Sequence, residues 1–136
     1  MAVAAPSLLA LPGCGVLTAA KFVGEPAGIT RFATEAKFAR HAGIAPIPVW
    51  LGRTERRVRS TRSGNRQLNA AIHRIAVTQI RLIDSLGKTY YDRKKTEGMS
   101  TSEASRCLKR RLARVVYNTL TTDHQTAART YLPAAA

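Results

Sequence analysis

The chain has 136 residues, 45% of them hydrophobic and 22% charged, a composition that supports one packed domain and excludes a wholly disordered chain. Lys and Arg number 22 against 8 Asp and Glu, which gives a formal net charge of +14. So large a charge favours a polyanionic partner such as nucleic acid. A membrane partner is disfavoured, because the arginines do not oppose a bulky apolar helix face and no segment approaches the ~18 apolar residues of a membrane span.

Residues 1–7 are expected to form a flexible tail, followed by one helical domain at 8–121 and a second flexible tail at 122–136. The domain opens with LLALPGCGVLTAAKFVG, which predicts a short apolar helical turn, a tight hairpin and a helix from about Val16 to Gly24. Gly13 and Gly15 suit that hairpin because glycine tolerates the backbone angles of a tight turn. A helix-hairpin-helix-like element of this kind can direct free backbone N–H groups at a phosphate, and a plain turn between two core helices is the alternative.

The next segment carries the densest positive charge. Phe32, Ala36 and Ala39 recur at helical spacing and predict a helix that ends at Gly43. Residues 43–64 combine prolines, glycines and polar residues, which predicts an irregular basic loop that has room for a short hairpin. Because guanidinium groups fork onto phosphate oxygens, the arginines of this region are predicted to contact nucleic acid. They are Arg53, Arg56, Arg57, Arg59, Arg62 and Arg66, interrupted in charge by Glu55 alone.

The second half of the chain has clear helical periodicity. One apolar stripe predicts a helix from Asn65 to a break at Gly87, and a short helix around Tyr90 and Tyr91 should end at Gly98. The stripe consists of Leu68, Ile72, Ile75, Gln79 and Leu82, widened by Ala71, Ala76 and Ile83. A final helix begins at Ser100, where Glu103 completes a capping box. On its outer face, Lys109 and Arg110 are predicted nucleic-acid contacts, although such side chains can also simply cover apolar surface.

These patterns predict a mainly α fold: a small helical domain with an N-terminal helix-hairpin-helix-like element and a basic irregular loop. Catalytic patterns are weak. The acidic residues form no paired set that would hold a metal, and no histidine has a partner at ligand spacing. Cys14 and Cys107 lie in apolar stretches without a CxxC motif, which indicates reduced thiols in a cytoplasmic protein. Ser60 and Ser63 lie in the basic loop without an evident base beside them, so we expect no catalytic residue, cofactor or metal in this chain.

Four blocks of the sequence together resemble a known family: LLALPGCGVLTAAKFVGE, ITRFATEAKFARHAGIAPIPVW, GNRQLNAAIHRIAVTQIRL and YYDRKKTEGMSTSEASRCLKRRLARVVYNTL. They are similar to the C-terminal transposase domain of DEDD-type insertion-sequence transposases, whose relatives use an RNA bridge to choose their DNA sites. The resemblance covers about residues 8–120. It implies a helical domain that binds DNA and a structured guide RNA and that supplies a serine nucleophile. Since such recombinases act on two DNA duplexes, it also makes a homo-oligomer plausible.

The resemblance breaks at the nucleophile. The family pattern places a serine directly before a glycine; in GIAPIPVWLG the glycine is Gly52 and the serine position holds Leu51. Leucine has no hydroxyl and cannot attack a phosphodiester. The family metal ion would belong to an N-terminal nuclease domain that this sequence does not show. The resemblance therefore predicts a truncated, catalytically inactive fragment that keeps nucleic-acid binding, and a small basic RNA- or ribosome-associated structural protein is the alternative.

Overall fold

The computed structural model describes residues 5–44, 46–48, 58–60 and 64–131. Most of these residues are helical, so the predicted mainly α class is confirmed. In chain order the elements are the 3-10 helix η1 (Pro6–Ala10), α1 (Val16–Gly24), the 3-10 helix η2 (Ile29–Arg31), α2 (Glu35–His41), β1 (Pro46–Pro48), β2 (Val58–Ser60), α3 (Arg66–Arg81), α4 (Leu86–Thr96) and α5 (Thr101–Tyr131).

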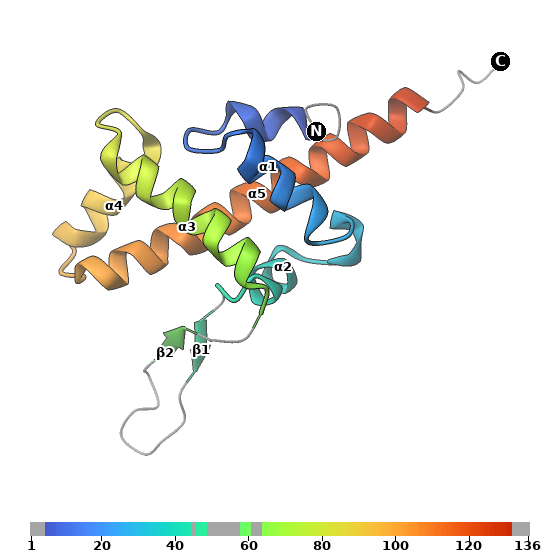
Figure 1. The fold of residues 1–136 in the computed structure, drawn as a ribbon. Coiled ribbons are helices and arrows are strands. Elements are labelled where there is room, and N and C mark those ends of the chain that lie inside the picture. Colours follow the sequence, from blue (N-terminus) through green and yellow to red (C-terminus); the bar gives the residue numbers. More distant parts are fainter. Residues whose placement is uncertain (1–4, 45, 49–57, 61–63, 132–136) are drawn as a thin grey trace.

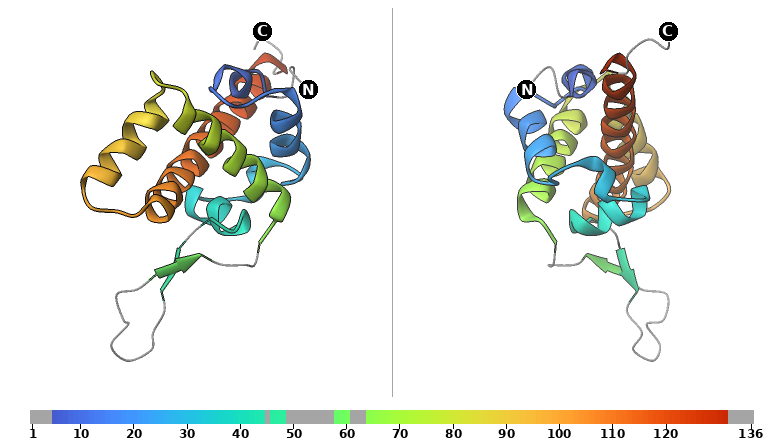
Figure 2. Two further views of the ribbon diagram at one scale, coloured as in Figure 1. Left: turned by 60° about the vertical axis from the view of Figure 1, so that its left-hand side comes forward. Right: turned by 90° about the vertical axis from the view of Figure 1, so that its right-hand side faces the viewer.

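The longest helix, α5, is the axis on which most of the other helices pack. It begins with the predicted capping box, in which Glu103 N donates to Ser100 Oγ over 3.2 Å and Ser100 N donates to Glu103 Oε2 over 2.9 Å. Helices α2, α3 and α4 and both 3-10 helices contact α5, which crosses the whole molecule in Figure 1. In the right-hand view of Figure 2, α1 and α3 lie together on one side of α5.

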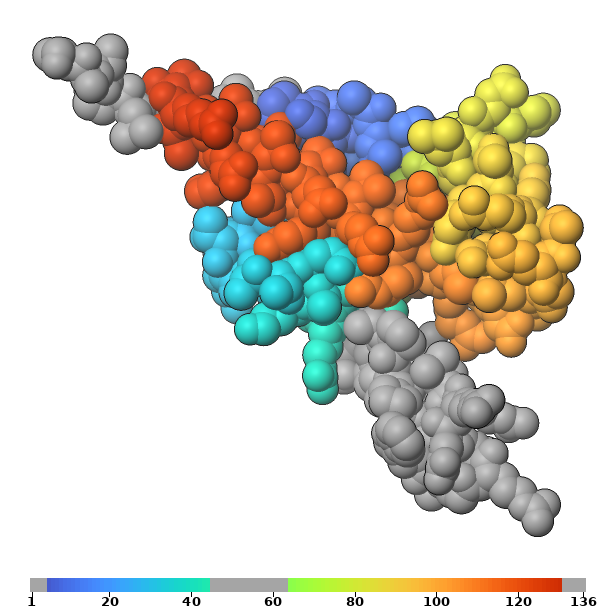
Figure 3. Space-filling view, turned by 180° about the vertical axis from the view of Figure 1, so that it is seen from behind, coloured from blue at the N-terminus to red at the C-terminus, as the bar shows by residue number. Residues whose placement is uncertain are grey.

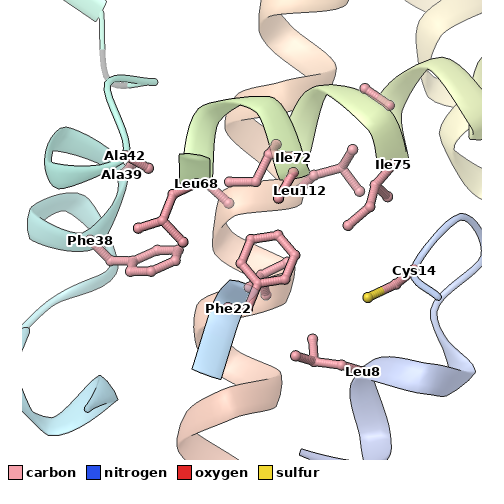
Figure 4. Packing of buried hydrophobic residues seen from close by; sticks show 14 of the residues in the cluster. Leu8, Cys14, Phe22, Phe38, Ala39, Ala42, Leu68, Ile72, Ile75 and Leu112 are labelled. Carbon is pink, nitrogen blue, oxygen red and sulfur yellow. The ribbon is translucent and has the colours of Figure 1, made fainter. Parts of the chain in front are cut away.

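One apolar core joins these helices. Figure 4 shows Phe22 of α1 and Phe38 of α2 converging with side chains of η1, α3 and α5. Each fully buried side chain of this size contributes about 1.5–3 kcal/mol relative to exposure in water. The largest fully buried side chains are Phe22, Phe38, Leu8, Leu68, Ile72, Ile75, Leu108, Val116 and Pro26. Within the described part of the chain, no helix is both long and apolar enough to cross a membrane.

The junction of α3 and α4 differs from the prediction. The helix does not run to Gly87: α3 ends at Arg81, and Gly87 lies inside α4. Ser85 is the N-cap residue of α4, because its Oγ accepts from Lys88 N over 3.0 Å. The same Oγ donates to Gln79 O over 2.6 Å. Glycine stands at 87 because α4 crosses close to α3; an added Cβ would lie 2.8 Å from the Cβ of Gln79.

The prediction that the apolar stripe of this helix includes Leu82 and Ile83 is also wrong. Leu82 and Ile83 are 44% and 82% exposed, whereas Leu68 and Ile75 of the same stripe are fully buried. The backbone becomes extended at Leu82, with ψ at 112°, so the helical period stops there and the two side chains leave the core face.

The described part of each predicted tail belongs to the folded region. Helix α5 continues past the predicted boundary at 121 to Tyr131. A part-buried polar contact ties the start of this extension to the fold: the carboxylate of Asp123 accepts from Ser7 Oγ over 2.6 Å and from Ser7 N over 3.1 Å. Ala5, which falls in the predicted N-terminal tail, is fully buried.

The region between α2 and α3 contains the short hairpin pairing that the sequence allowed. Strands β1 and β2 pair antiparallel, with Ile47 opposite Arg59, and they project from the end of the molecule where α2 stops and α3 starts (Figures 1 and 2). Helix α2 is shorter than predicted because Thr34 caps it, its side chain accepting from Lys37 N over 3.2 Å. Phe32 precedes the helix and packs edge-on against Phe38, with ring centroids 5.6 Å apart.

Candidate nucleic-acid interface

A group of backbone contacts, here called the neck, holds the point where the 45–63 segment leaves and rejoins the helices. The neck consists of residues 41–44 and 64–65. Ile44 N donates to Ala39 O over 2.9 Å, and Asn65 N donates to His41 O over 2.6 Å. Gly64 has φ at +101°, and an added Cβ would lie 2.7 Å from Gly43 N. The two segments of the chain therefore touch at a place that only glycine fits.

Side chains at the end of α1 and in the first turns of α3 support the neck. Asn65 caps α3, since its Oδ1 accepts from Leu68 N over 3.0 Å. Its Nδ2 donates over 3.0 Å to Oε2 of Glu25, the residue that follows α1. Asn69 Nδ2 donates to Gly43 O over 3.2 Å. These contacts attach both sides of the neck to rigid elements.

Lys109 belongs to this support. Its Nζ donates to Asn69 Oδ1 over 2.8 Å, which orients the Asn69 amide toward Gly43. Burial lowers the pKa of the Lys109 ammonium, because desolvation disfavours the charged form. The nucleic-acid contact predicted for Lys109 stays a prediction, and the structure shows the side chain already engaged within the fold.

Arg110 is engaged in a similar way. Its Nη1 forms an ion pair with Glu35 Oε1 in the first turn of α2, and Arg114 Nε lies 3.7 Å from the same oxygen. Arg110 and Glu35 are both partly buried, and their pair ties the first turn of α2 to α5. The nucleic-acid role predicted for Arg110 likewise stays a prediction.

The hairpin glycines take different positions. Gly13 has φ at +90°, and an added Cβ would lie 3.2 Å from the Cα of Ile75, so this turn is pressed against α3. Gln79 Nε2 also holds the turn by donating to Pro12 O over 2.9 Å. Gly15 is the exposed N-cap residue of α1. Packing alone explains Gly13, which favours the plain-turn alternative over a phosphate site.

The structure brings only part of the predicted arginine run into view. Arg66 is the exposed first residue of α3, and Arg59 lies in β2, next to Ser60 at the strand's end. The remaining predicted positions of this region lie outside the described residues: Leu51, Arg53, Arg56, Arg57, Arg62 and Ser63.

Sequence reasoning missed two features. The first is the neck. Its only local signal was Gly64 followed by Asn65 directly before a periodic helix, a pattern that marks the start of the helix but not the contact with residues 41–44. The second, here called the Tyr90 cluster, consists of Tyr90, Arg93 and Lys94 of α4 and Arg111 of α5. Its first three members are spaced three and four residues apart, which places them on one helix face. The fourth comes from another helix, and no local pattern could have added it.

Metal-ligating chemistry is not visible in the described part of the chain, where no three His, Cys, Asp or Glu residues come together. His41, one of the histidines considered, packs its ring against Phe32 with centroids 5.1 Å apart. Cys14 is buried and Cys107 partly buried, and both are free thiols.

We expect Lys109→Met to weaken the neck. Losing the ammonium leaves Asn69 Oδ1 without its donor in a partly buried position, which should cost about 1–2 kcal/mol of unfolding free energy. Because the folded-state pKa of Lys109 is lowered, the unfolded chain binds more protons between that pKa and the ordinary 10.5. The parent should therefore gain stability relative to the variant as pH rises through that window.

Urea denaturation of both proteins at a series of alkaline pH values measures this difference. Lys37→Met, which removes an exposed ammonium from α2, is the matched control and should change stability little. A parent-minus-variant difference that stays flat with pH would contradict the assignment.

The geometry defines a small, strongly basic helical domain whose helices hold a two-stranded projection at one end. A family model described as "Transposase IS116/IS110/IS902 family" matches residues 5–92, and the chain belongs to this family. The family-level identification made from the sequence blocks is thereby confirmed, while the DEDD class and the RNA bridge stay predictions.

Curated relatives agree with the family model. The chain is 36% identical over 118 residues to the insertion element IS900 uncharacterized 42 kDa protein of Mycobacterium paratuberculosis, covering 86% of this chain and 29% of that protein. It is 34% identical over 112 residues to the insertion element IS110 uncharacterized 43.6 kDa protein of Streptomyces coelicolor, covering 82% of this chain and 27% of that protein. The chain thus spans less than a third of the length of these relatives.

Proposed function

We propose that this chain is the DNA-binding part of an insertion-sequence transposase and acts in DNA transposition. The observation that carries the proposal is membership of the transposase family together with a formal net charge of +14 on 136 residues. Phosphate neutralisation by Lys and Arg supplies most of the affinity of sequence-tolerant DNA binding. A chain of this family and charge has the chemistry for that task.

The acidic residues are few, and most of those described contact other groups of this domain, which supports the proposal. In the described part of the chain, Glu35, Asp92 and Glu97 form ion pairs, and these engage Lys88, Lys94, Arg110 and Arg114. Glu25, Glu103 and Asp123 accept instead from neutral donors, namely the Asn65 side-chain amide, the Ser100 backbone N–H and Ser7. The 8 acidic residues can offset only a minority of the 22 Lys and Arg charges, so the positive field of the surface remains available to a polyanion.

The neck also supports the proposal, because it fixes the ends of the basic segment. It anchors both ends of the segment that contains the arginine run to α2 and α3. Holding both ends reduces the conformational freedom that would be lost when a partner binds, which favours affinity. We therefore assign the arginine run to the phosphate backbone of DNA, with a structured guide RNA as a second nucleic-acid ligand of the same domain.

The proposed role is binding without strand cleavage by this chain. Leu51, outside the described residues, occupies the position of the serine that the family resemblance assigns as nucleophile. The metal ion of the resemblance would belong to the nuclease domain, so no metal role is proposed here. Self-association through two bound duplexes fits this role and would be measured by light scattering with and without DNA.

Duplex-DNA binding should be strong at low salt and weaken steeply as salt rises. If roughly four to six phosphates are contacted, the logarithm of affinity should fall with the logarithm of salt at a slope of about −4 to −5. Replacing Arg56, Arg57 and Arg59 by Ala should weaken binding and make the slope shallower by about 2 to 3. Fluorescence anisotropy with a labelled duplex measures both quantities.

A matched control removes the same charge elsewhere. Arg74, Arg81 and Arg129 are exposed in the described helices, and replacing these three by Ala should alter the slope much less. A flat titration of the parent would refute DNA binding, and equal losses in both triple variants would refute the arginine run as the contact. A labelled RNA hairpin that binds while the duplex does not would favour the RNA-associated alternative.

A further inference from the structure

The Tyr90 cluster gathers three cations on a single aromatic ring. Arg111 Cζ lies 4.8 Å from the Tyr90 ring centroid, Arg93 Cζ 5.3 Å and Lys94 Nζ 5.6 Å. Two of the cations come from α4 and one from α5, helices that contact each other and lie side by side in Figures 1 and 3. The convergence is therefore a product of the α4–α5 packing.

The charge of the cluster is mostly uncompensated. Lys94 Nζ lies 3.1 Å from Glu97 Oε2, but Arg93 and Arg111 form no ion pair with any residue that the structure describes. Both arginines are exposed. The Tyr90 ring attracts each cation through its quadrupole, by about 0.5–1 kcal/mol at an exposed site, yet it carries no net charge. An anion placed between these cations would relieve their mutual repulsion.

The ring also prepares the arginines for phosphate. A guanidinium near an aromatic face keeps its N–H donors at its edge, where they can fork onto two oxygens of one phosphate. Side chains held by the ring lose less conformational freedom on binding than free ones. The cluster is carried by α4 and α5, whereas the neck consists of residues 41–44 and 64–65 between α2 and α3, so the two surfaces are built from different residues.

We propose that the Tyr90 cluster is a second DNA-binding surface, which holds backbone phosphates of a duplex through Arg93 and Arg111. The inference rests on the proposed DNA-binding function and adds a contact site outside the arginine run. Tyr90 acts as a positioning residue: it sets the two guanidinium groups in place and makes no contact with a base. Lys94, which forms an ion pair with Glu97, adds to the positive electrostatic field but is not proposed to contact a phosphate directly.

The test compares two charge-matched double variants in the same duplex anisotropy assay. Arg93→Gln with Arg111→Gln should weaken binding at low salt about tenfold and make the salt slope shallower by about 1 to 2, which corresponds to two lost phosphate contacts. Arg74→Gln with Arg129→Gln removes the same charge from exposed positions elsewhere on α3 and α5 and should change the slope by less than about 0.5. Melting curves establish that both variants are folded.

A second pair of variants tests the ring. Tyr90→Phe keeps an aromatic face and should bind like the parent, whereas Tyr90→Leu should weaken binding severalfold at a temperature where its melting curve shows it folded. Equal affinity losses in the two double variants, or a Tyr90→Leu protein that binds like the parent, would overturn the inference while parent binding upholds the proposed function. A parent without salt-dependent duplex binding would overturn both, and a cluster variant impaired only toward an RNA hairpin would overturn DNA as the partner.

Discussion

Ile75→Asp is expected to unfold the domain at moderate temperature. Ile75 is fully buried in α3, and the turn at Gly13 packs directly on its backbone. A carboxylate at this position would lose its hydration without gaining a partner, at a cost of several kcal/mol. That cost is comparable with the about 5–15 kcal/mol that stabilises a typical domain.

Circular dichroism melting and urea denaturation measure this loss. His73→Asp is the matched control, because His73 is exposed two residues earlier on the same helix. The control should melt within a few degrees of the parent, since surface substitutions usually change stability by at most about 0.5 kcal/mol. An Ile75→Asp protein that melts like the parent would show that α3 does not face the core as described.

Gly64→Ala is expected to cost about 3 kcal/mol, because it combines two penalties. The backbone at Gly64 has φ at +101°, which side chains of L-residues rarely adopt. The added Cβ would also lie 2.7 Å from Gly43 N and 2.9 Å from Gly43 Cα, and both are backbone atoms that cannot rotate away. The neck would have to open to accommodate the methyl group.

Substitutions at two other glycines allow the conformational penalty and the steric penalty to be measured separately. Gly98→Ala places the same methyl group at φ +100° with nothing within 4 Å, so it should lose only the conformational part, about 1–2 kcal/mol. Gly15→Ala has open space and an ordinary φ of −84°, so it should lose the least, about 0.5 kcal/mol for the poorer N-cap. Urea denaturation of the three variants should rank the loss as Gly64, Gly98, Gly15. Equal losses at Gly64 and Gly98 would remove the case for close contact in the neck.

Local patterns predicted a large part of the helical framework. The capping box at Ser100 and Glu103 formed as expected, and α1 spans Val16 to Gly24 as predicted. Such features depend on residues within one turn of each other, so neighbouring residues in the sequence are enough to specify them. The family-level identification also came from contiguous sequence blocks and was confirmed.

Crossings between helices could not be predicted in this way. Gly87 suggested a helix break, yet it lies inside α4 because Gln79 of α3 leaves no room for a Cβ. The same limit applied to the candidate site. Arg110 reads as an outward cation from its place on α5, but Glu35, 75 residues earlier, pairs with it. Lys109 reads in the same way and donates instead to Asn69.

The amino-acid sequence by itself determined the helical class, the main apolar faces and the surplus of positive charge, which follow from composition and short-range periodicity. It also determined the family, through the resemblance of contiguous sequence blocks. Only the tertiary structure decided which cations are engaged within the fold and which converge on an exposed surface. Lys109 supports the neck and Arg110 ties α2 to α5, while Arg93 and Arg111 meet at Tyr90. The physical reason is that side-chain partners on different helices are chosen by how those helices pack, and that packing joins residues far apart in the chain.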